Sequence, residues 1–189
     1  KELGVTCVRY PGGNFVSNYN WEDGIGPREN RPMRRDLAWH CTETNEMGID
    51  DFYRWSQKAG TEIMLAVNMG TRGLKAALDE LEYVNGAPGT AWADQRVANG
   101  IEEPMDIKMW CIGNEVPDQW NGDRGPKLSR FLQDICHRED PTRPVTQGMD
   151  APDAVVNNNM AAVMDVAGFN YRPHKYRTNY KKLPQQIIL

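Results

Sequence analysis

The chain has 189 residues and a mass of 21.5 kDa, and its 40% hydrophobic and 25% charged residues are typical of a globular protein. Its 22 Lys and Arg against 26 Asp and Glu give a net charge of −4 without a basic run, which argues against nucleic-acid binding. No apolar run approaches the roughly 18 residues that span a bilayer. The chain opens on Lys-Glu-Leu-Gly, without Met or a signal-peptide core, so we expect it to be cut from a longer protein.

Short apolar and β-branched runs alternate with amphipathic stretches along the chain, which is the pattern of strands followed by helices. The six predicted strands lie at 4–9, 61–68, 107–113, 144–148, 163–170 and 185–189. Helices are predicted at 49–58, 74–85, 126–137 and 153–160, with a short further helix at 94–98. The long segment 15–44 has little regular pattern, but its tryptophans indicate an ordered loop.

One strand in roughly 31 residues is the spacing of βα units, which predicts an α/β fold with a parallel sheet. A doubly wound sheet would carry a Gly-x-Gly-x-x-Gly phosphate loop after its first strand, and residues 11–14 (PGGN) do not match it. A (β/α)8 barrel of the TIM type instead gathers polar residues just past its strand ends. The chain fits that pattern at Arg9, Asn14, Asn68, Asn114, Glu115, Gln147, Asp150, Asn170 and Tyr171. We therefore expect residues 1–189 to form a single TIM-barrel-like domain.

Glu115 is the strongest catalytic candidate, because it follows the apolar strand end 110–113 and stands beside Asn114. A carboxylic acid partly desolvated by Trp110 or Trp120 can keep its proton near neutral pH and donate it to a leaving-group oxygen. The alternative is a carboxylate without a chemical role, either solvated at the strand end or placed in the first turn of a helix. Asn114 can donate to a sugar hydroxyl next to the reacting carbon, or it can close the strand in an Asx turn.

Arg9, the loop tryptophans and the histidines each leave alternatives open. The Arg9 guanidinium can orient a carboxylate in a pocket, or it can pair with a structural acid at the rim of the barrel. Trp39, like the other loop tryptophans, can present its ring to sugar C–H groups or staple its loop to the core. His40, His137 and His174 have no nucleophile at an interpretable spacing, so we expect surface residues or hydrogen-bonded caps.

The four cysteines, Cys7, Cys41, Cys111 and Cys136, are too widely spaced for a zinc site, so we expect no metal and no other cofactor. Cys7 and Cys111 lie in apolar runs, where a free thiol packs as a small buried hydrophobic side chain. Reduced thiols and the lack of a leader in the sequence favour the cytoplasm.

Six longer motifs resemble the catalytic domain of family 51 glycoside hydrolases, the α-L-arabinofuranosidases. They lie at 9–15 (RYPGGNF), 19–27 (YNWEDGIGP), 36–39 (DLAW), 43–46 (ETNE), 66–73 (AVNMGTRG) and 110–115 (WCIGNE). This resemblance covers residues from about 4 to 115. From about 105 to 189, notably at 165–171 (DVAGFNY), the sequence instead resembles the barrel of family 2 glycoside hydrolases, the β-galactosidases.

Both families are retaining (β/α)8 glycosidases that share the Gly-Asn-Glu strand end, so a join near 105–120 would keep the barrel in register. The two-part resemblance therefore predicts a chimera or a designed, recombined chain. It also implies an incomplete barrel that holds about strands 2 to 7.

The resemblance implies roles for seven residues. Glu115 is implied as the general acid/base, and Tyr171 as the tyrosine that hydrogen-bonds the nucleophile. The residues implied in substrate binding are Asn114, Arg9, Asn14, Trp39 and Asn68. In both families the nucleophile is a glutamate at the end of the seventh strand, and here that strand candidate, 185–189, ends the sequence. A retaining mechanism therefore needs a carboxylate from outside these residues.

Three functions remain as hypotheses. The first is a retaining O-glycoside hydrolase that acts on α-L-arabinofuranosides or related plant polysaccharide side chains, with β-galactosides as an alternative substrate class. A complementing fragment or a second copy would close its barrel, because an open barrel exposes unpaired strand edges. The second is a non-catalytic carbohydrate-binding scaffold, and the third is a purely structural barrel fragment. No nucleic acid or membrane is expected as a partner.

Overall fold

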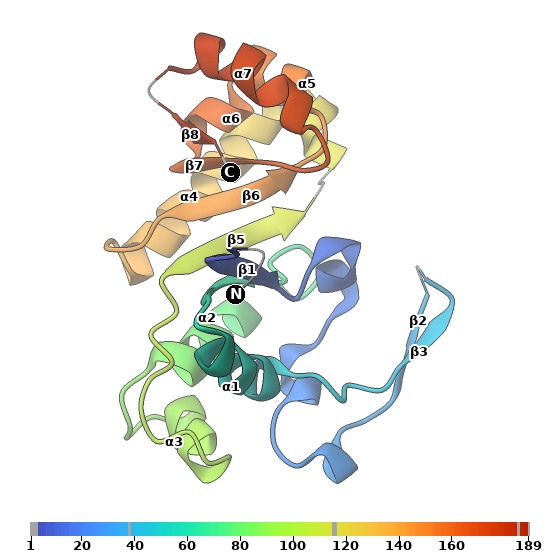
Figure 1. The fold of residues 1–189 in the computed structure, drawn as a ribbon, viewed down its shortest axis with the longest axis vertical. Helices are drawn as coiled ribbons and strands as arrows, with labels where there is room; N and C mark the ends of the chain where they lie inside the picture. Colours follow the sequence, from blue (N-terminus) through green and yellow to red (C-terminus); the bar gives the residue numbers. More distant parts are fainter. Residues whose placement is uncertain (1–3, 38, 115–116, 185, 189) are drawn as a thin grey trace. The chain divides into compact units, whose positions relative to one another are not determined.

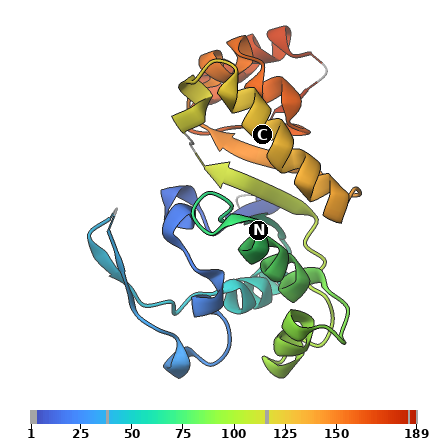
Figure 2. The ribbon, with the colours of Figure 1, turned by 180° about the vertical axis from the view of Figure 1, so that it is seen from behind.

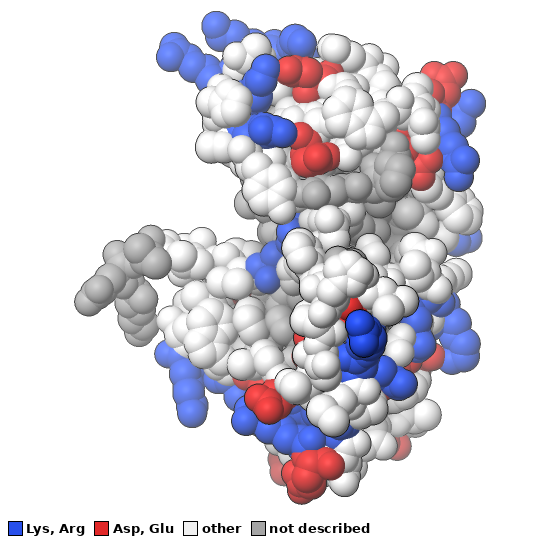
Figure 3. Space-filling model, turned by 90° about the vertical axis from the view of Figure 1, so that its right-hand side faces the viewer, with Lys and Arg blue, Asp and Glu red and all other residues white. Residues whose placement is uncertain are grey.

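A computed structural model describes residues 4–37, 39–114, 117–184 and 186–188 (Figure 1, and from behind in Figure 2). The chain divides into an N-terminal unit, residues 1–108, and a C-terminal unit, residues 109–189, which are described one at a time. On each unit, the face seen in Figure 3 carries positive and negative side chains interspersed. Among the described residues, no helix is long and apolar enough to cross a membrane.

The N-terminal unit is built on two parallel strands and three helices. Strand β1 (Cys7–Tyr10) pairs with β4 (Glu62–Ala66), so that Val8 lies opposite Ile63 and Tyr10 opposite Leu65. Helix α1 (Ile49–Ala59) precedes β4, and it ends at Gly60, whose φ of 69° is the left-handed conformation that glycine adopts without strain. Helices α2 (Gly73–Asn85) and α3 (Ala91–Ala98) follow. The two strands and all three helices confirm the sequence prediction.

The long segment between β1 and α1 is ordered, as its tryptophans predict, but it contains a hairpin that the sequence pattern does not reveal. Three short 3-10 helices come first, η1 (Gly13–Asn18), η2 (Trp21–Gly24) and η3 (Arg28–Asn30). Strands β2 (Arg34–Asp36) and β3 (Cys41–Glu43) then pair antiparallel. Each strand is only three residues long and mostly exposed, so there is no apolar alternation by which to predict it.

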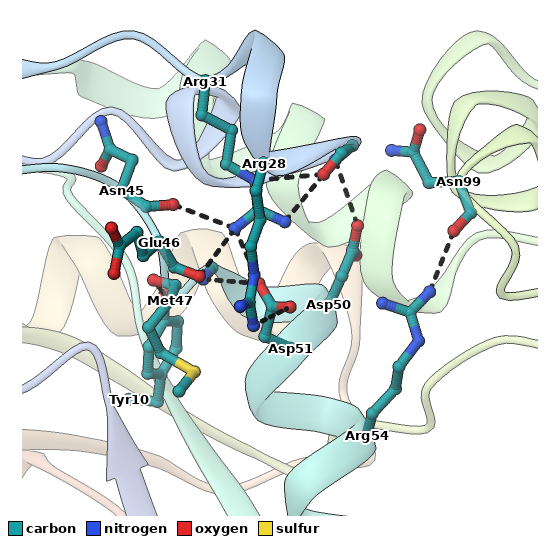
Figure 4. A network of polar contacts seen from close by, with 12 residues as sticks. Tyr10, Arg28, Arg31, Asn45, Glu46, Met47, Asp50, Asp51, Arg54 and Asn99 are labelled. Atoms are coloured by element: carbon teal, nitrogen blue, oxygen red, sulfur yellow. Dashed lines mark hydrogen bonds and ion pairs between the residues drawn. The ribbon is translucent and has the colours of Figure 1, made fainter.

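Arg31 fastens this segment to the start of α1 (Figure 4). Its guanidinium is almost fully buried and donates to the Gly26 carbonyl at 2.7 Å, to the Asn45 carbonyl at 2.9 Å and to Asp51 Oδ2 at 2.7 Å. Asp51 also accepts the Gly48 backbone N–H at 3.1 Å. Burial alone would raise the pKa of Asp51, but the bonds from Arg31, Gly48 and Arg28 outweigh it and hold the pKa below its usual value.

A second buried cluster seats η2 on α2. The Trp21 indole is buried and donates from Nε1 to the Ala76 carbonyl at 3.1 Å, and its ring lies 5.3 Å from that of Tyr83. The next residue, Glu22, forms an ion pair with Arg72 through one carboxylate oxygen, while the other oxygen is buried without a hydrogen-bond partner among the described residues.

Glu80 lies one helical turn beyond Ala76, on the same face of α2, and it is 2% exposed. Burial and the nearby Glu22 carboxylate raise its pKa well above the usual value. The Glu80 charge also contributes to the raised pKa values of Tyr10 and Tyr19, so both phenols lie within its electrostatic reach. The folded protein therefore favours the neutral form of Glu80.

This burial predicts a stability that falls as the pH rises. The folded protein holds the Glu80 proton more tightly than the unfolded chain, in which a glutamate has a pKa near 4.3. From about that pH up through the higher pKa of the folded state, Glu80 lowers the free energy of unfolding by about 1.4 kcal/mol per pH unit. Glu80→Gln removes this titration. We therefore expect the free energy of unfolding, measured with denaturant between pH 5 and 9, to fall less steeply with pH in the variant than in the unmodified chain.

Exposed Glu103 provides the matched control, because Glu103→Gln removes the same charge without burial. The free energy of unfolding of Glu103→Gln should change with pH as it does in the unmodified chain. A Glu80→Gln curve parallel to that of the unmodified chain would show that Glu80 is ionised in the folded state.

The C-terminal unit is a parallel sheet of four strands in chain order, covered by helices. The strands are β5 (Met109–Asn114), β6 (Val145–Met149), β7 (Val166–Phe169) and β8 (Ile187–Ile188). Helix α4 (Arg124–Glu139) connects β5 to β6 and lies along one face of the sheet (Figure 2). The buried side chains of Cys111, Ile112, Val145 and Phe169 form much of the strand core. All four strands and α4 confirm the prediction.

Two of the connections depart from the prediction. The single helix expected at 153–160 is two helices, α5 (Pro152–Asn157) and α6 (Met160–Val163), because Asn159 between them is left-handed at φ 66°. Helix α7 (Pro173–Lys182) is not predicted, because its sequence is polar and lacks an apolar stripe. The parallel α/β class is confirmed, while the assignment of these strands to barrel positions 2 to 7, the single domain and the join near 105–120 stay predictions.

Candidate functional site

Two asparagines meet at the carboxyl edge of the C-terminal sheet. Asn114 ends β5 and is 5% exposed, and Asn170 directly follows β7. Asn170 Nδ2 donates to Asn114 Oδ1 at 3.1 Å. The Asn170 backbone N–H donates to the Met149 carbonyl at 2.8 Å, which ties this position to the end of β6. The sequence prediction that residues after the strands gather at one edge is confirmed for this pair.

Asn114 lies in register with a glycine of the neighbouring strand. Asn114 pairs with Gly148, and Gly148 pairs with Gly168, so the three positions form one row across the sheet. Gly148 has no side chain, so β6 adds none at the position paired with Asn114.

Tyr171 occupies a strained position at the same edge. Its φ is 59°, a left-handed conformation that is rare for a residue with a bulky side chain, and it is 71% exposed. Such conformations concentrate at functional sites. The role of Tyr171 beside a nucleophile stays a prediction. Glu115, the predicted acid/base, lies outside the described residues.

Gln119 is a structural member of this edge that the sequence analysis does not identify. It lies in η4 (Pro117–Trp120), is 2% exposed, and its Oε1 accepts the backbone N–H groups of Asp150 and Ala151, each at 3.2 Å. Its Nε2 donates to the Asp150 carboxylate, and its backbone carbonyl accepts from Asn158 Nδ2 at 3.0 Å. A glutamine in an irregular segment carries no spacing signal, so only the folded contacts reveal it.

These contacts separate the strand-end residues by role. Asp150 accepts a hydrogen bond from Gln119, which fastens η4 to the end of β6. The next residue, Trp120, is 66% exposed. Gln147 is buried and accepts from Ser129 of α4 at 2.9 Å, so its side chain serves the interior. Gln147 and Asp150, which the strand-end pattern predicts as polar residues of the site, therefore make structural contacts.

In the N-terminal unit, the predicted binding residues lie in β1, after β4 or in the long segment between β1 and α1. Arg9 is half-buried in β1, and Asn14 is exposed in η1. Trp39 is 63% exposed in the turn of the hairpin, and its backbone N–H donates to Asp36 Oδ1 at 2.9 Å. The roles of Arg9, Asn14 and Trp39 in substrate binding stay predictions.

Asn68 uses both ends of its amide within the protein. Its Nδ2 donates to the Tyr19 carbonyl at 3.2 Å, and its Oδ1 accepts from the Thr71 backbone N–H at 3.1 Å and from the Thr71 hydroxyl at 2.9 Å. It thus ties the loop after β4 to the end of η1. These bonds engage Asn68 within the protein, and its predicted role in substrate binding stays a prediction.

A hollow lined partly by the hairpin is too small for a sugar. Its volume is about 40 Å³, roughly the space of a single water molecule, and Asp23, Arg34, Asp36 and Glu43 are among its lining residues. Arg34 binds both carboxylate oxygens of Asp23, at 2.8 and 2.9 Å, and these bonds hold the pKa of Asp23 below its usual value. The hollow is thus part of the hairpin anchor.

The cysteines are free thiols in different surroundings. Cys111 is buried, as its apolar run predicts, whereas Cys7 is only half-buried and Cys41 is exposed. Burial raises the pKa of Cys136 to about 11, and burial together with the Glu62 charge raises that of Cys7. Within the described ranges, no group of three or more His, Cys, Asp or Glu side chains is arranged to hold a metal ion.

The contacts of Gln119 predict a large stability loss on its removal. Gln119→Ala leaves the backbone N–H groups of Asp150 and Ala151 without their acceptor, so we expect the free energy of unfolding to fall by about 2 kcal/mol. Asn121→Ala, which removes an exposed amide just after η4, should change it by less than about 0.5 kcal/mol. Urea unfolding measures both, and equal effects would refute this account of η4.

Comparison with known proteins gives a consistent family assignment. Residues 1–186 match the family model described as the alpha-L-arabinofuranosidase 1 domain. An intracellular exo-alpha-(1->5)-L-arabinofuranosidase of Bifidobacterium longum is 97% identical over 120 residues, which are 64% of this chain and 21% of that protein. An exo-alpha-(1->6)-L-arabinofuranosidase of the same species is 59% identical over 121 residues, 64% of this chain and 23% of its own length.

A solved structure gives the same answer for the fold. The family 51 alpha-L-arabinofuranosidase AbfB of Bifidobacterium longum matches with a TM-score of 0.78 and 62% identity, over 93% of this chain and 38% of its own. The chain therefore spans about a fifth of the curated relatives that it matches and less than two fifths of this solved structure.

Proposed function

Because the chain belongs to the alpha-L-arabinofuranosidase 1 domain family, we propose that it forms part of a retaining glycoside hydrolase that releases α-L-arabinofuranosyl residues. The observation that carries the proposal is the pair of Asn114 and Asn170 at the carboxyl edge of the C-terminal sheet, because Asn114 directly precedes Glu115 in sequence. A parallel α/β sheet presents its functional residues at this edge. Non-catalytic sugar binding and a purely structural role are less well supported, because the relatives are named as enzymes.

In this proposal, Glu115 protonates the glycosidic oxygen as the bond to the sugar breaks and then activates water. Asn114 donates an amide hydrogen bond to a sugar hydroxyl beside the reacting carbon, and Tyr171 supports the nucleophile. The second carboxylate of the mechanism, which must lie roughly 5 Å from the first, is a glutamate outside the 189 residues. This second carboxylate bonds to the sugar as the leaving group departs, and water then breaks that bond, so the configuration of the sugar is retained.

Four residues of the N-terminal unit complete the proposed substrate contacts. Arg9 and Asn14 supply a charged and an amide donor, and the exposed ring of Trp39 offers an apolar face to the sugar. Asn68 supports these contacts through its bonds to Tyr19 and Thr71. The α-(1→5) linkage named for the relative that is 97% identical is the linkage that we propose for the substrate. Its name also supports a cytoplasmic location, and β-galactosides are not favoured.

The uneven likeness supports a join between two sequences. The relative that is 97% identical matches 120 residues, 64% of the chain, and we place the proposed join near 105–120. The family match nevertheless extends to residue 186, so both parts suit one barrel family. We propose that both parts belong to one barrel that holds about strands 2 to 7.

The acid role of Glu115 predicts a dependence on the leaving group. In a protein completed by the segment that supplies the nucleophile, Glu115→Gln should slow the hydrolysis of aryl arabinofuranosides with poor leaving groups far more than the hydrolysis of those with good ones. Good leaving groups depart without protonation, so their first step does not need the acid. Steady-state kinetics on a leaving-group series measures this, with Glu103→Gln as the surface control. Equal losses across the series would contradict the acid role.

Strand β8 offers an edge at which the barrel can be completed. Of the described strands, β7 is its neighbour, and Ile187 is 67% exposed. Beside it lies an apolar hollow of about 570 Å³, lined by Tyr176, Arg177, Tyr180, Pro184, Gln186, Ile187 and Ile188. Unpaired apolar edges bind further strands, so we propose that a complementing fragment or a second copy of the chain pairs here.

This edge predicts self-association of the isolated chain. Light scattering should give a mass above 21.5 kDa, and Ile187→Lys should return it to the monomer value, because a charge on an edge strand opposes pairing. Lys181→Arg, which keeps the charge of an exposed residue on α7, should leave the larger mass unchanged. A monomer for the unmodified chain would remove the second copy from the proposal.

A further inference from the structure

Three asparagines of the chain directly precede a glycine, at 85–86, 99–100 and 121–122. An Asn-Gly pair can rearrange without an enzyme, because the backbone nitrogen of the glycine can attack the side-chain carbonyl carbon of the asparagine. Glycine has no side chain to obstruct this attack. The reaction needs a backbone N–H that no hydrogen bond holds and an amide that is free to turn. The three pairs share this chemistry, so their folded surroundings decide which of them reacts.

The pair at 85–86 is held on both sides. The Asn85 amide donates to the Ile107 carbonyl at 3.0 Å and accepts the Ile107 N–H at 2.8 Å. The Gly86 N–H donates to the Glu82 carbonyl at 2.8 Å. Neither the amide nor the nitrogen can move toward the other until these bonds open.

The pair at 99–100 is held in the same way. The Asn99 amide donates to the Tyr83 hydroxyl at 2.9 Å and accepts from Gln95 Nε2 at 3.1 Å. The Gly100 N–H donates to the Val97 carbonyl at 2.9 Å. This pair is therefore protected as well.

Asn121 and Gly122 lie between η4 and α4, and both are exposed. Within the described residues, the Gly122 N–H makes no hydrogen bond. The Asn121 amide donates to Asp118 Oδ1 at 3.5 Å, which exceeds the usual range of about 2.7 to 3.2 Å. Apart from the chain neighbours of Gly122, no heavy atom lies within 4 Å of the point at which a side chain on it would begin. Both reacting groups of this pair are thus weakly held and uncrowded.

We propose that Asn121 is a site of spontaneous deamidation. The Gly122 nitrogen forms a bond to Asn121 Cγ, and the side-chain nitrogen leaves with the Gly122 hydrogen as ammonia, which closes a succinimide ring. Water then opens the ring at one of its two carbonyl carbons and leaves aspartate or isoaspartate. Either product adds a negative charge beside the Asp118 carboxylate, and isoaspartate also adds an atom to the main chain directly after η4. The inference does not depend on the proposed function.

Incubation of the folded 189-residue chain at mildly alkaline pH tests the proposal, because loss of its proton makes the Gly122 nitrogen a nucleophile. Trypsin then releases three peptides, 76–96, 97–108 and 109–124, each with one Asn-Gly pair. Mass spectrometry measures the mass gain from amide to acid in each peptide. We expect peptide 109–124 to change at least about tenfold faster than the other two, since a held pair reacts only while its bonds are open. Equal rates in the three peptides, or a slower rate in 109–124, would overturn the proposal.

Two controls assign the change to the fold and to a single residue. In denaturant the three pairs lose their hydrogen bonds, so the three peptides should change at similar rates. A preference for peptide 109–124 that persists there would refute the role of the folded contacts. Asn121→Gln keeps an exposed amide but would have to close a larger ring, so peptide 109–124 should stay unmodified over the same time. A mass gain that continues in this variant would place the reaction at another residue, such as Asn114, and would also overturn the proposal.

Discussion

In the C-terminal unit, β5, β6, β7 and β8 pair in parallel and in chain order, so the residue that follows each strand is delivered to the same edge. Asn114 and Asn170, 56 positions apart in sequence, come within 3.1 Å for this reason. Gly148 of β6 pairs with Asn114 and with Gly168, so β6 adds no side chain at that row.

In the N-terminal unit, most candidate residues lie in the long segment between β1 and α1, which contains only short elements. Polar side-chain contacts, more than strand pairing, hold this segment in place. Arg31 donates to three backbone carbonyls, those of Gly26, Asn45 and Glu46, and to the Asp51 carboxylate, which compensates for burying its charge. Trp21 and Glu22 seat η2 on α2 in the same way, through the Ala76 carbonyl and Arg72.

Much of this fold follows from the sequence, because apolar strands and amphipathic helices repeat in it with the βα spacing. The hairpin β2–β3 and helix α7 do not follow, since neither has an apolar periodicity. Of the site, the sequence pattern predicts that Asn114 and Asn170 share an edge, but it does not predict that they bond to one another. The role of Gln119 depends entirely on contacts with Asp150, Ala151 and Asn158 that are distant in sequence.

Asn68 and Asn114 show why position after a strand is not sufficient to assign a role. Both are amides at the carboxyl side of a parallel strand, and sequence patterning treats them alike. Asn68 binds Tyr19 through its nitrogen and Thr71 through its oxygen, so its amide joins two loops. The bond from Asn170 engages the oxygen of Asn114, so this amide joins the ends of two strands instead of two loops. Position after a strand does not distinguish the two asparagines, because each is defined by the groups that the fold brings to it.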